Sequence, residues 1–256
     1  MVELKEITDF LFSLAPDYLA ESYDNVGLLV EGENDKIENV LVALDVDASV
    51  AEEAISKKCS LILSHHPLIF KPLSRISRND AVSLLIKNGI SLYSMHTNFD
   101  ALKGGLCDVL LEKIAKTDDA LPLSDGESTI GRIAELEEEM TLSEFAENVK
   151  STLCLDFLKT VGEKDRKIKK IAICGGGGGD FVYDAYHKGA DLYISGDFKY
   201  HHARFAFETG MALMEIPHYD AEILFIDEME DVIKAHFGGK LNVIKSEKNV
   251  NPWNVI

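Results

Sequence analysis

Two adjacent histidines, His65 and His66, follow the apolar run 61–63 and precede Pro67. Successive side chains of a strand point to opposite faces, so the two imidazoles converge only where the strand breaks, and Pro67 favours a break there. Neutral imidazoles are common ligands of transition metals. The alternative for this pair taken alone is one hydrogen-bonded core histidine and one surface histidine.

Two later segments also end an apolar run with a histidine and a carboxylate. His96 and Asp100 follow the run 92–95, and His218 and Glu222 follow the run 213–217. The spacing of four between His218 and Glu222 places both side chains on one face of a helix that begins by His218. Histidine and carboxylate ligands suit iron, zinc and manganese alike.

As ligands we count the imidazoles of His65, His66 and His218 and the carboxylates of Asp100 and Glu222. Three imidazoles and two carboxylates exceed the needs of one tetrahedral ion. Asp100 adds an acceptor that can bridge two cations. The residues therefore predict a dinuclear site with two divalent metal ions per chain, whose identity the ligand types leave open.

The elements that must position these residues alternate between strands and helices. In the first half, the apolar patterns predict helices over 3–15, 49–58, 79–88 and 104–115, and strands over 26–30, 39–46, 60–64 and 90–95. In the second half, they predict strands over 131–136, 157–162, 168–174, 191–195, 211–216 and 241–245, and helices over 141–153, 180–188, 199–209 and 222–237. Strands that alternate with helices at this spacing indicate βαβ units and an α/β fold.

The polar segment 116–127 contains Pro122 and Gly126 and marks a boundary between two lobes. We expect residues 1–120 with 220–256 in the first α/β lobe and residues 121–219 in the second. Both halves show a similar order of elements without a sequence repeat, which indicates a structural duplication.

The charge and hydropathy of the chain limit the kinds of partner it can have. It has 256 residues, 44 of them acidic and 26 basic, and a net charge of −18. Such a charge repels phosphate backbones, so nucleic acid is not an expected partner. No run approaches the roughly 20 apolar residues that cross a bilayer, and the first residues lack a secretory signal pattern. We therefore expect a cytoplasmic protein without membrane association.

The four cysteines, Cys59, Cys107, Cys154 and Cys174, are scattered and show no CxxC spacing. Buried small hydrophobic side chains in a reducing compartment are favoured over disulfides or thiolate ligands.

A glycine run, Gly175 to Gly179, lies between a predicted strand and a predicted helix. Backbone amides at a helix start bind anions. The run lacks the Lys-Ser/Thr of a P-loop, however, and Asp180 at the helix cap would oppose a phosphate. A tight turn beside the site is favoured, and direct contact with a substrate phosphate is the alternative.

Three further histidines are candidates for proton transfer. His96 precedes a proposed ligand by four positions, so it can support the site or move protons. One of His201 and His202 can reach the site, because Ser195 to Asp197 should end a strand beside it, although a surface position is equally compatible. We take His96 and His202 as candidate catalytic residues.

Five segments carry a resemblance to a known family: Glu21 to Leu28, Ser64 to Phe70, His96 to Asp100, Ala190 to Asp197 and Pro217 to Glu222. Together they resemble the Nif-three-like family, whose members are commonly named GTP cyclohydrolase I type 2 homologues. Motif by motif, the family's dinuclear metal ligands fall on His65, His66, Asp100, His218 and Glu222. The resemblance implies two α/β lobes with mixed sheets flanked by helices, metals between the lobes, and a toroidal homohexamer.

Two positions depart from the family pattern without removing a ligand. Tyr23 stands where tryptophan is usual, which keeps a large amphipathic ring, and Pro217 stands where glycine is expected.

The chemistry of such a site follows from its metals. Two divalent cations about 3.5 to 4 Å apart lower the pKa of a shared water towards ~7 and polarise the bond under attack, so hydrolysis is the expected reaction class. For a GTP-like substrate, which the resemblance implies, attack falls on C8 of the purine while His96 or His202 moves protons. The alternatives are hydrolysis of a phosphate ester, and a protein without turnover that binds or delivers metal or acts as a ring-shaped binding partner.

Overall fold

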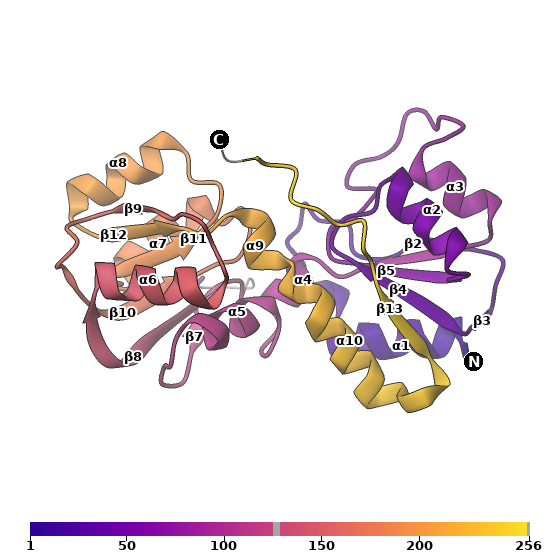
Figure 1. The fold of residues 1–256 in the computed structure, drawn as a ribbon, viewed down its shortest axis with the longest axis horizontal. Coiled ribbons are helices and arrows are strands. Elements are labelled where there is room, and N and C mark those ends of the chain that lie inside the picture. Colours follow the sequence, from indigo (N-terminus) through magenta and orange to yellow (C-terminus); the bar gives the residue numbers. More distant parts are fainter. Residues whose placement is uncertain (125–128, 255–256) are drawn as a thin grey trace. The chain divides into compact units, whose positions relative to one another are not determined.

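The computed structural model describes residues 1–124 and 129–254, and the chain forms two compact units (Figure 1). Unit 1 comprises Met1–Phe99 and Phe225–Ile256, and unit 2 comprises Asp100–Leu224. Each unit has its own mixed sheet flanked by helices, so the predicted α/β fold class is confirmed.

Unit 1 is built on a five-stranded sheet. Its elements are β1 (Val2–Glu3), α1 (Leu4–Leu14), η1 (Asp17–Leu19), β2 (Gly27–Val30), β3 (Lys36–Ile37), β4 (Asn39–Ala43), α2 (Ala48–Ser56), β5 (Leu61–Ser64), α3 (Ala81–Lys87), β6 (Ser91–Ser94), α10 (Leu224–Phe237), η3 (Gly238–Lys240) and β13 (Asn242–Lys245). The strand order is β13-β4-β5-β6-β2, parallel from β13 to β6 with β2 antiparallel at the edge. Strands β1 and β3 form a separate antiparallel pair.

Helices cover both faces of this sheet. Figure 1 shows α2 and α3 on one side of β4 and β5, and α1 and α10 on the other. Aspartates cap α2 and α3: Asp47 accepts from Val50 N at 2.9 Å, and Asp80 accepts from Ser83 N at 2.8 Å. Every residue of β5 is buried, as expected for a parallel strand between two helical layers.

Unit 2 is built on a six-stranded sheet. Its elements are α5 (Leu106–Ile114), β7 (Leu121–Pro122), β8 (Arg132–Thr141), α6 (Leu142–Thr152), β9 (Lys159–Val161), β10 (Lys167–Ile173), η2 (Gly179–Phe181), α7 (Val182–His187), β11 (Leu192–Ser195), α8 (Tyr200–Thr209), β12 (Ala212–Glu215) and α9 (His218–Glu222). The order is β7-β8-β10-β11-β12-β9, in which only β10, β11 and β12 run parallel to one another.

The helices predicted over 141–153 and 180–188 both form in unit 2. The capping box forms at the start of α6, where Glu144 N donates to Thr141 Oγ1 at 3.2 Å and Thr141 N donates to Glu144 Oε2 at 2.8 Å. The helix expected from residue 180 begins as the short η2 turn and continues as α7.

The two sheets share a plan, which supports the expected duplication. In each unit three consecutive strands, β4-β5-β6 and β10-β11-β12, lie side by side and parallel. Beyond the third strand lies an antiparallel strand that precedes the three in sequence, β2 in unit 1 and β9 in unit 2. Side chains that follow these parallel strands therefore gather at the carboxyl end of each sheet, where α/β proteins bind ligands.

The chain passes between the units at other positions than the predicted boundaries, which were 120/121 and 219/220. The chain passes from unit 1 to unit 2 after Phe99 and returns after Leu224. The physical reason is α5, which packs Leu110 and Ile114 into the core of unit 2. A buried ion pair, Arg132 Nε to Asp108 Oδ1 at 2.7 Å, also ties α5 to β8.

Two helices near the candidate ligands were not predicted as separate elements. The segment after His96 forms the short helix α4 (Thr97–Ala101), which crosses from unit 1 to unit 2. The helix expected over 222–237 is preceded by α9, which begins at His218. In the described parts of the chain, none of the helices has the length and apolar character needed to span a membrane.

Candidate metal centre

Three histidines gather at the carboxyl end of the sheet in unit 1. His65 and His66 follow β5, and His96 follows β6, which lies beside β5. One ring nitrogen from each lies within 4.8 Å of the other two. The ring centroids are 5.2 Å apart for His65–His66 and His65–His96, and 5.4 Å apart for His66–His96. The end of β5 thus brings both adjacent imidazoles to one place.

The Nδ1 atom of each of these imidazoles lies within hydrogen-bonding distance of a carbonyl or carboxylate oxygen, which can accept a hydrogen bond but cannot donate one. The three bonds are His65 Nδ1 to Met95 O at 2.8 Å, His66 Nδ1 to Asp45 Oδ1 at 2.8 Å, and His96 Nδ1 to Asp24 Oδ1 at 2.9 Å. Nδ1 therefore carries the proton, and in the neutral ring Nε2 presents a lone pair. Proteins orient metal-binding imidazoles in this way. The residues of unit 1 fit a divalent cation.

In unit 2, His218 and Glu222 lie together on α9, as their spacing predicts. His218 Nδ1 donates to Asp197 Oδ2 at 2.8 Å, and its Nε2 lies 2.8 Å from Glu222 Oε2. Burial lowers the pKa of His218, but its bonds to Glu222 and Asp197 and their charges outweigh this and raise the pKa to about 9. A cation that binds here replaces the proton on Nε2. This donor set also fits a divalent cation.

Asp100, on α4, is buried in the same unit, with 6% of its surface exposed; Glu222 has 3%. Both act on Cys174, whose pKa is raised by a hydrogen bond that its thiol donates to Cys107, by burial, and by the charges of Cys107, Asp100 and Glu222. Cys174 therefore remains a neutral thiol.

The other cysteines divide by burial. Cys59 and Cys107 are buried like Cys174, and burial raises the pKa of Cys59 to about 11. Cys154 is exposed, so the prediction of a buried side chain is wrong at this position. It follows the last turn of α6 with a positive φ of 55°.

The glycine run packs directly against the unit 2 ligands. A Cβ atom at Gly176, whose φ is +58°, would lie 1.9 Å from Glu222 Oε1 and 3.2 Å from His218 Nε2. The carbonyl of Gly176 accepts from Gly196 N at 2.8 Å, and the carbonyl of Gly178 accepts from Tyr193 Oη at 2.5 Å. The run is therefore a tight turn that supports Glu222, while contact with a substrate phosphate stays a prediction.

His202, rather than His201, is enclosed within unit 2, with 1% of its surface exposed. Its Nδ1 accepts from Lys199 N at 3.2 Å, so its Nε2 carries the proton, which it donates to Asp180 Oδ1 at 3.0 Å. His201 is exposed, and its ring centroid lies 4.3 Å from that of His202. A catalytic role for His202 stays a prediction, and any proton it moves passes through Asp180.

The carboxylates that hold the imidazoles were not predicted as functional residues. Asp45 follows β4 and Asp197 follows β11, so each stands at the same sheet end as the histidine it orients. A carboxylate after a parallel strand is the sequence signal that would have found them.

Asp24 was likewise not predicted as a functional residue. Its side chain is fully buried and accepts from His96 Nδ1, Thr97 N and Thr97 Oγ1, which lie more than 70 positions later in the chain. Burial raises the pKa of Asp24, but the bonds from His96 and Thr97 and the charge of His96 lower it to about 2. Asp24 is therefore an anion that fixes the ring of His96.

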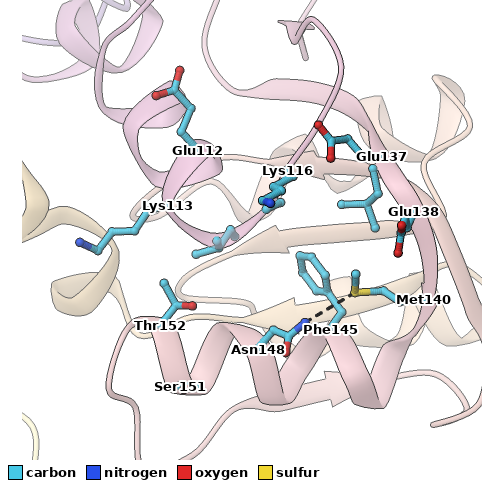
Figure 2. Close-up of a pocket in the computed structure, with 13 residues that line it drawn as sticks. Glu112, Lys113, Lys116, Glu137, Glu138, Met140, Phe145, Asn148, Ser151 and Thr152 are labelled. Carbon is cyan, nitrogen blue, oxygen red and sulfur yellow. Dashed lines mark hydrogen bonds between the residues drawn. The ribbon is translucent and has the colours of Figure 1, made fainter.

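A separate hollow of about 550 Å³ lies in unit 2 between the end of α5, β8 and α6 (Figure 2). Its wall includes Phe145 and the charged residues Lys116 and Glu138, and Asn148 Nδ2 donates to Met140 Sδ at 3.9 Å. None of the predicted metal or catalytic residues lines it. The candidate centre is therefore distinct from this hollow.

Two mixed α/β units that present histidines and carboxylates at the carboxyl ends of their parallel strands define a two-unit α/β protein with candidate metal ligands. The sequence profile of the DUF34/NIF3 (NGG1p interacting factor 3) family matches residues 2–252. The chain belongs to this family.

Relatives and solved structures agree with that assignment. The chain is similar to the GTP cyclohydrolase 1 type 2 homolog of Clostridium perfringens, with 37% identity over 263 residues that cover 100% of both chains. A Staphylococcus aureus crystal structure has a TM-score of 0.88 and 30% identity, covering 100% of this chain and 99% of that one. Reduced HcgD of Methanocaldococcus jannaschii has a TM-score of 0.83 and 29% identity, covering 96% and 98%.

Proposed function

We propose that this protein is a metal-dependent hydrolase with a dinuclear centre bound by His65, His66, Asp100, His218 and Glu222. The observation that carries the proposal is the common orientation of the three proposed histidine ligands. Each donates Nδ1–H to an oxygen, which directs Nε2 towards a cation, and His218 must first lose its Nε2 proton. Asp100 and Glu222 supply buried carboxylates, which a bound cation stabilises.

Divalent cations held by these residues supply Lewis-acid activation of water and of the bond under attack. His96 then serves as the proton carrier. Its Nδ1 is bonded to the buried Asp24 anion, so its Nε2 can take up a proton while Asp24 balances the charge of the imidazolium. His202 is the second candidate carrier and acts through Asp180.

The proposed substrate class comes from the relatives. Their shared name, GTP cyclohydrolase 1 type 2 homolog, indicates a purine nucleotide. On such a substrate, water would add to C8 of the purine, and cleavage of the C8–N9 bond would open the imidazole ring. Hydrolysis of a phosphate ester uses the same ligands and is tested alongside.

One observation favours a second function, which is metal binding or delivery without turnover. His218 and Glu222 form a direct ion pair, so a protonated His218 can compete with a cation for the Glu222 carboxylate. Such competition favours release of metal to a partner, because it lowers the cost of losing the ion.

The test counts metals per purified chain and screens the loaded protein against GTP and generic phosphoesters. Metal-dependent turnover that is lost in His65→Ala and retained in His187→Ala supports the enzyme, because His187 is an exposed histidine bonded to Tyr183 O within α7. Thermal unfolding of both metal-free variants controls for folding. Full metal content with no turnover on any substrate favours the delivery function.

We also propose a cytoplasmic homohexamer without nucleic-acid or membrane partners. Support comes from the family resemblance, the scattered cysteines and the net charge of −18. Sedimentation tests the assembly: six chains of 28.4 kDa give about 170 kDa, and a monomer contradicts the proposal.

A further inference from the structure

An exposed apolar and basic segment follows the histidine pair of unit 1. Residues 70–79 are exposed without interruption. Three are apolar: Phe70, Leu73 and Ile76, with 40%, 47% and 54% of their surface exposed. Three others are basic, Lys71, Arg75 and Arg78, and the segment has no acidic residue, although acidic residues outnumber basic ones by 44 to 26 in the chain. Its composition is thus opposite in charge to the rest of the protein.

Aromatic rings connect this segment to the imidazoles. The ring of Tyr23, which is 62% exposed, has its centroid 6.3 Å from that of Phe70, with an interplanar angle of 56°. The ring of Phe70 in turn lies 6.4 Å from that of His96 at an angle of 80°. The three rings form a series that runs from solvent to the proposed proton carrier.

Hydrogen bonds of His96 and of residues next to Tyr23 and Phe70 hold this series in place. Asn25 Nδ2 donates to Ile69 O at 2.5 Å and so joins the Tyr23 segment to the Phe70 segment. Asp24, between Tyr23 and Asn25, is fixed by its bonds from His96 and Thr97. The backbone beside both rings is therefore positioned in advance, which lowers the cost of binding a ligand against them.

We propose that Tyr23 and Phe70 stack a planar aromatic ring of the substrate next to His96, and that Lys71, Arg75 and Arg78 bind its anionic group. Aromatic side chains hold rings by stacking, and guanidinium groups pair with phosphate or carboxylate. A net charge of −18 repels a small anion, and a local basic segment offsets that repulsion at this position. The inference rests on the proposed function and specifies which residues select the substrate.

Calorimetric titration of the full-length, Mn²⁺-loaded protein tests the inference, with GTP as the aromatic anion and inorganic triphosphate as the anion without a ring. Tyr23→Leu and Phe70→Leu should each weaken GTP binding by roughly tenfold or more, because stacking on one aromatic side chain is worth about that much. Tyr23→Trp should keep the affinity. Triphosphate binding should be unchanged in the ring variants and weakened in Arg75→Gln.

Tyr18→Leu is the matched control, because Tyr18 is an exposed tyrosine of unit 1 in η1, with 81% of its surface exposed. Its GTP affinity should equal that of the wild type. Metal content is measured for every variant and should not change.

The inference is overturned if the wild type does not bind GTP, or if Tyr23→Leu and Phe70→Leu bind it as the wild type does. It is also overturned if these variants change the sedimenting mass instead of the GTP affinity, since the surface then joins copies of the chain. GTP binding that depends on both rings, without turnover on any substrate, refutes the proposed hydrolase and leaves the stacking site standing.

Discussion

Replacing Gly176 with alanine places a methyl group against the carboxylate of Glu222. The new Cβ would lie 1.9 Å from Glu222 Oε1, whereas ordinary contact begins at 3.4 Å, so the carboxylate must move by about 1.5 Å (3.4 − 1.9). The φ of +58° adds a backbone cost of roughly 1–2 kcal/mol for a residue with a Cβ atom. If Glu222 is a metal ligand, this displacement should lower the affinity for Mn²⁺ or Zn²⁺ by on the order of 10- to 100-fold.

Gly210→Ala separates the two effects. Gly210 ends α8 with a φ of +76°, and a Cβ there would meet nothing within 4 Å. This control therefore carries the backbone cost alone. Chelator-competition titrations measure the metal affinity of both variants, and urea unfolding of the metal-free proteins measures their stability. We expect both variants to lose stability and only Gly176→Ala to lose metal affinity.

Two results would refute this reasoning. Wild-type metal affinity in Gly176→Ala would show that the position of Glu222 does not matter for binding. An equal loss of affinity in Gly210→Ala would show that destabilisation, rather than displacement of the carboxylate, causes the effect.

Three further predictions follow from the same geometry. Asp24→Asn should destabilise the metal-free protein by about 2 kcal/mol near neutral pH, since the buried Asp24 carboxyl has its pKa lowered from 3.8 to about 2. The difference from wild type should be constant above pH 4 and shrink as the pH falls towards 2. Because the pKa of His218 is raised to about 9, its stabilising pair with Glu222 is fully present below pH 6.5 and is lost as the pH rises through 9. Metal must displace the same proton, so metal affinity should rise about tenfold per pH unit between pH 7 and 8.5. In the native protein only Cys154 should react rapidly with a thiol reagent, and four thiols should react after denaturation.

Each of these has a contradicting outcome. A stability difference for Asp24→Asn that does not change between pH 6 and 3 would show that the Asp24 carboxylate is not the source of the effect. Metal affinity that is independent of pH would exclude a proton on His218 as the competitor. Rapid reaction of two or more thiols in the native protein would show that the buried cysteines are accessible.

Local elements could be predicted from the sequence where one pattern determines them. The capping box of α6 needs only Thr141 and Glu144, and helix α1 ends before Pro16 as the apolar pattern indicates. The meeting of His65 and His66 follows from a strand that ends before Pro67. In each case the deciding contacts lie within a few residues of one another.

Features that depend on contacts between distant parts of the chain could not be predicted from the sequence. The buried pair of Asp108 and Arg132, which ties α5 to unit 2, joins residues 24 positions apart. In the sequence, Asp24 next to Asn25 is typical of a turn. Its role in fixing His96 could not be predicted, because His96 lies 72 positions away. The start of α8 turns His202, and not the adjacent His201, into unit 2. The sequence alone does not show which of the two is buried.

Anomalous diffraction from metal-loaded crystals tests the central claim most directly. The account predicts two metal peaks per chain, bound by Nε2 of His65, His66 and His218 and by carboxylate oxygens of Asp100 and Glu222. Peaks at other residues, such as Asp180 and His201, or no peak at the five proposed ligands, would contradict it.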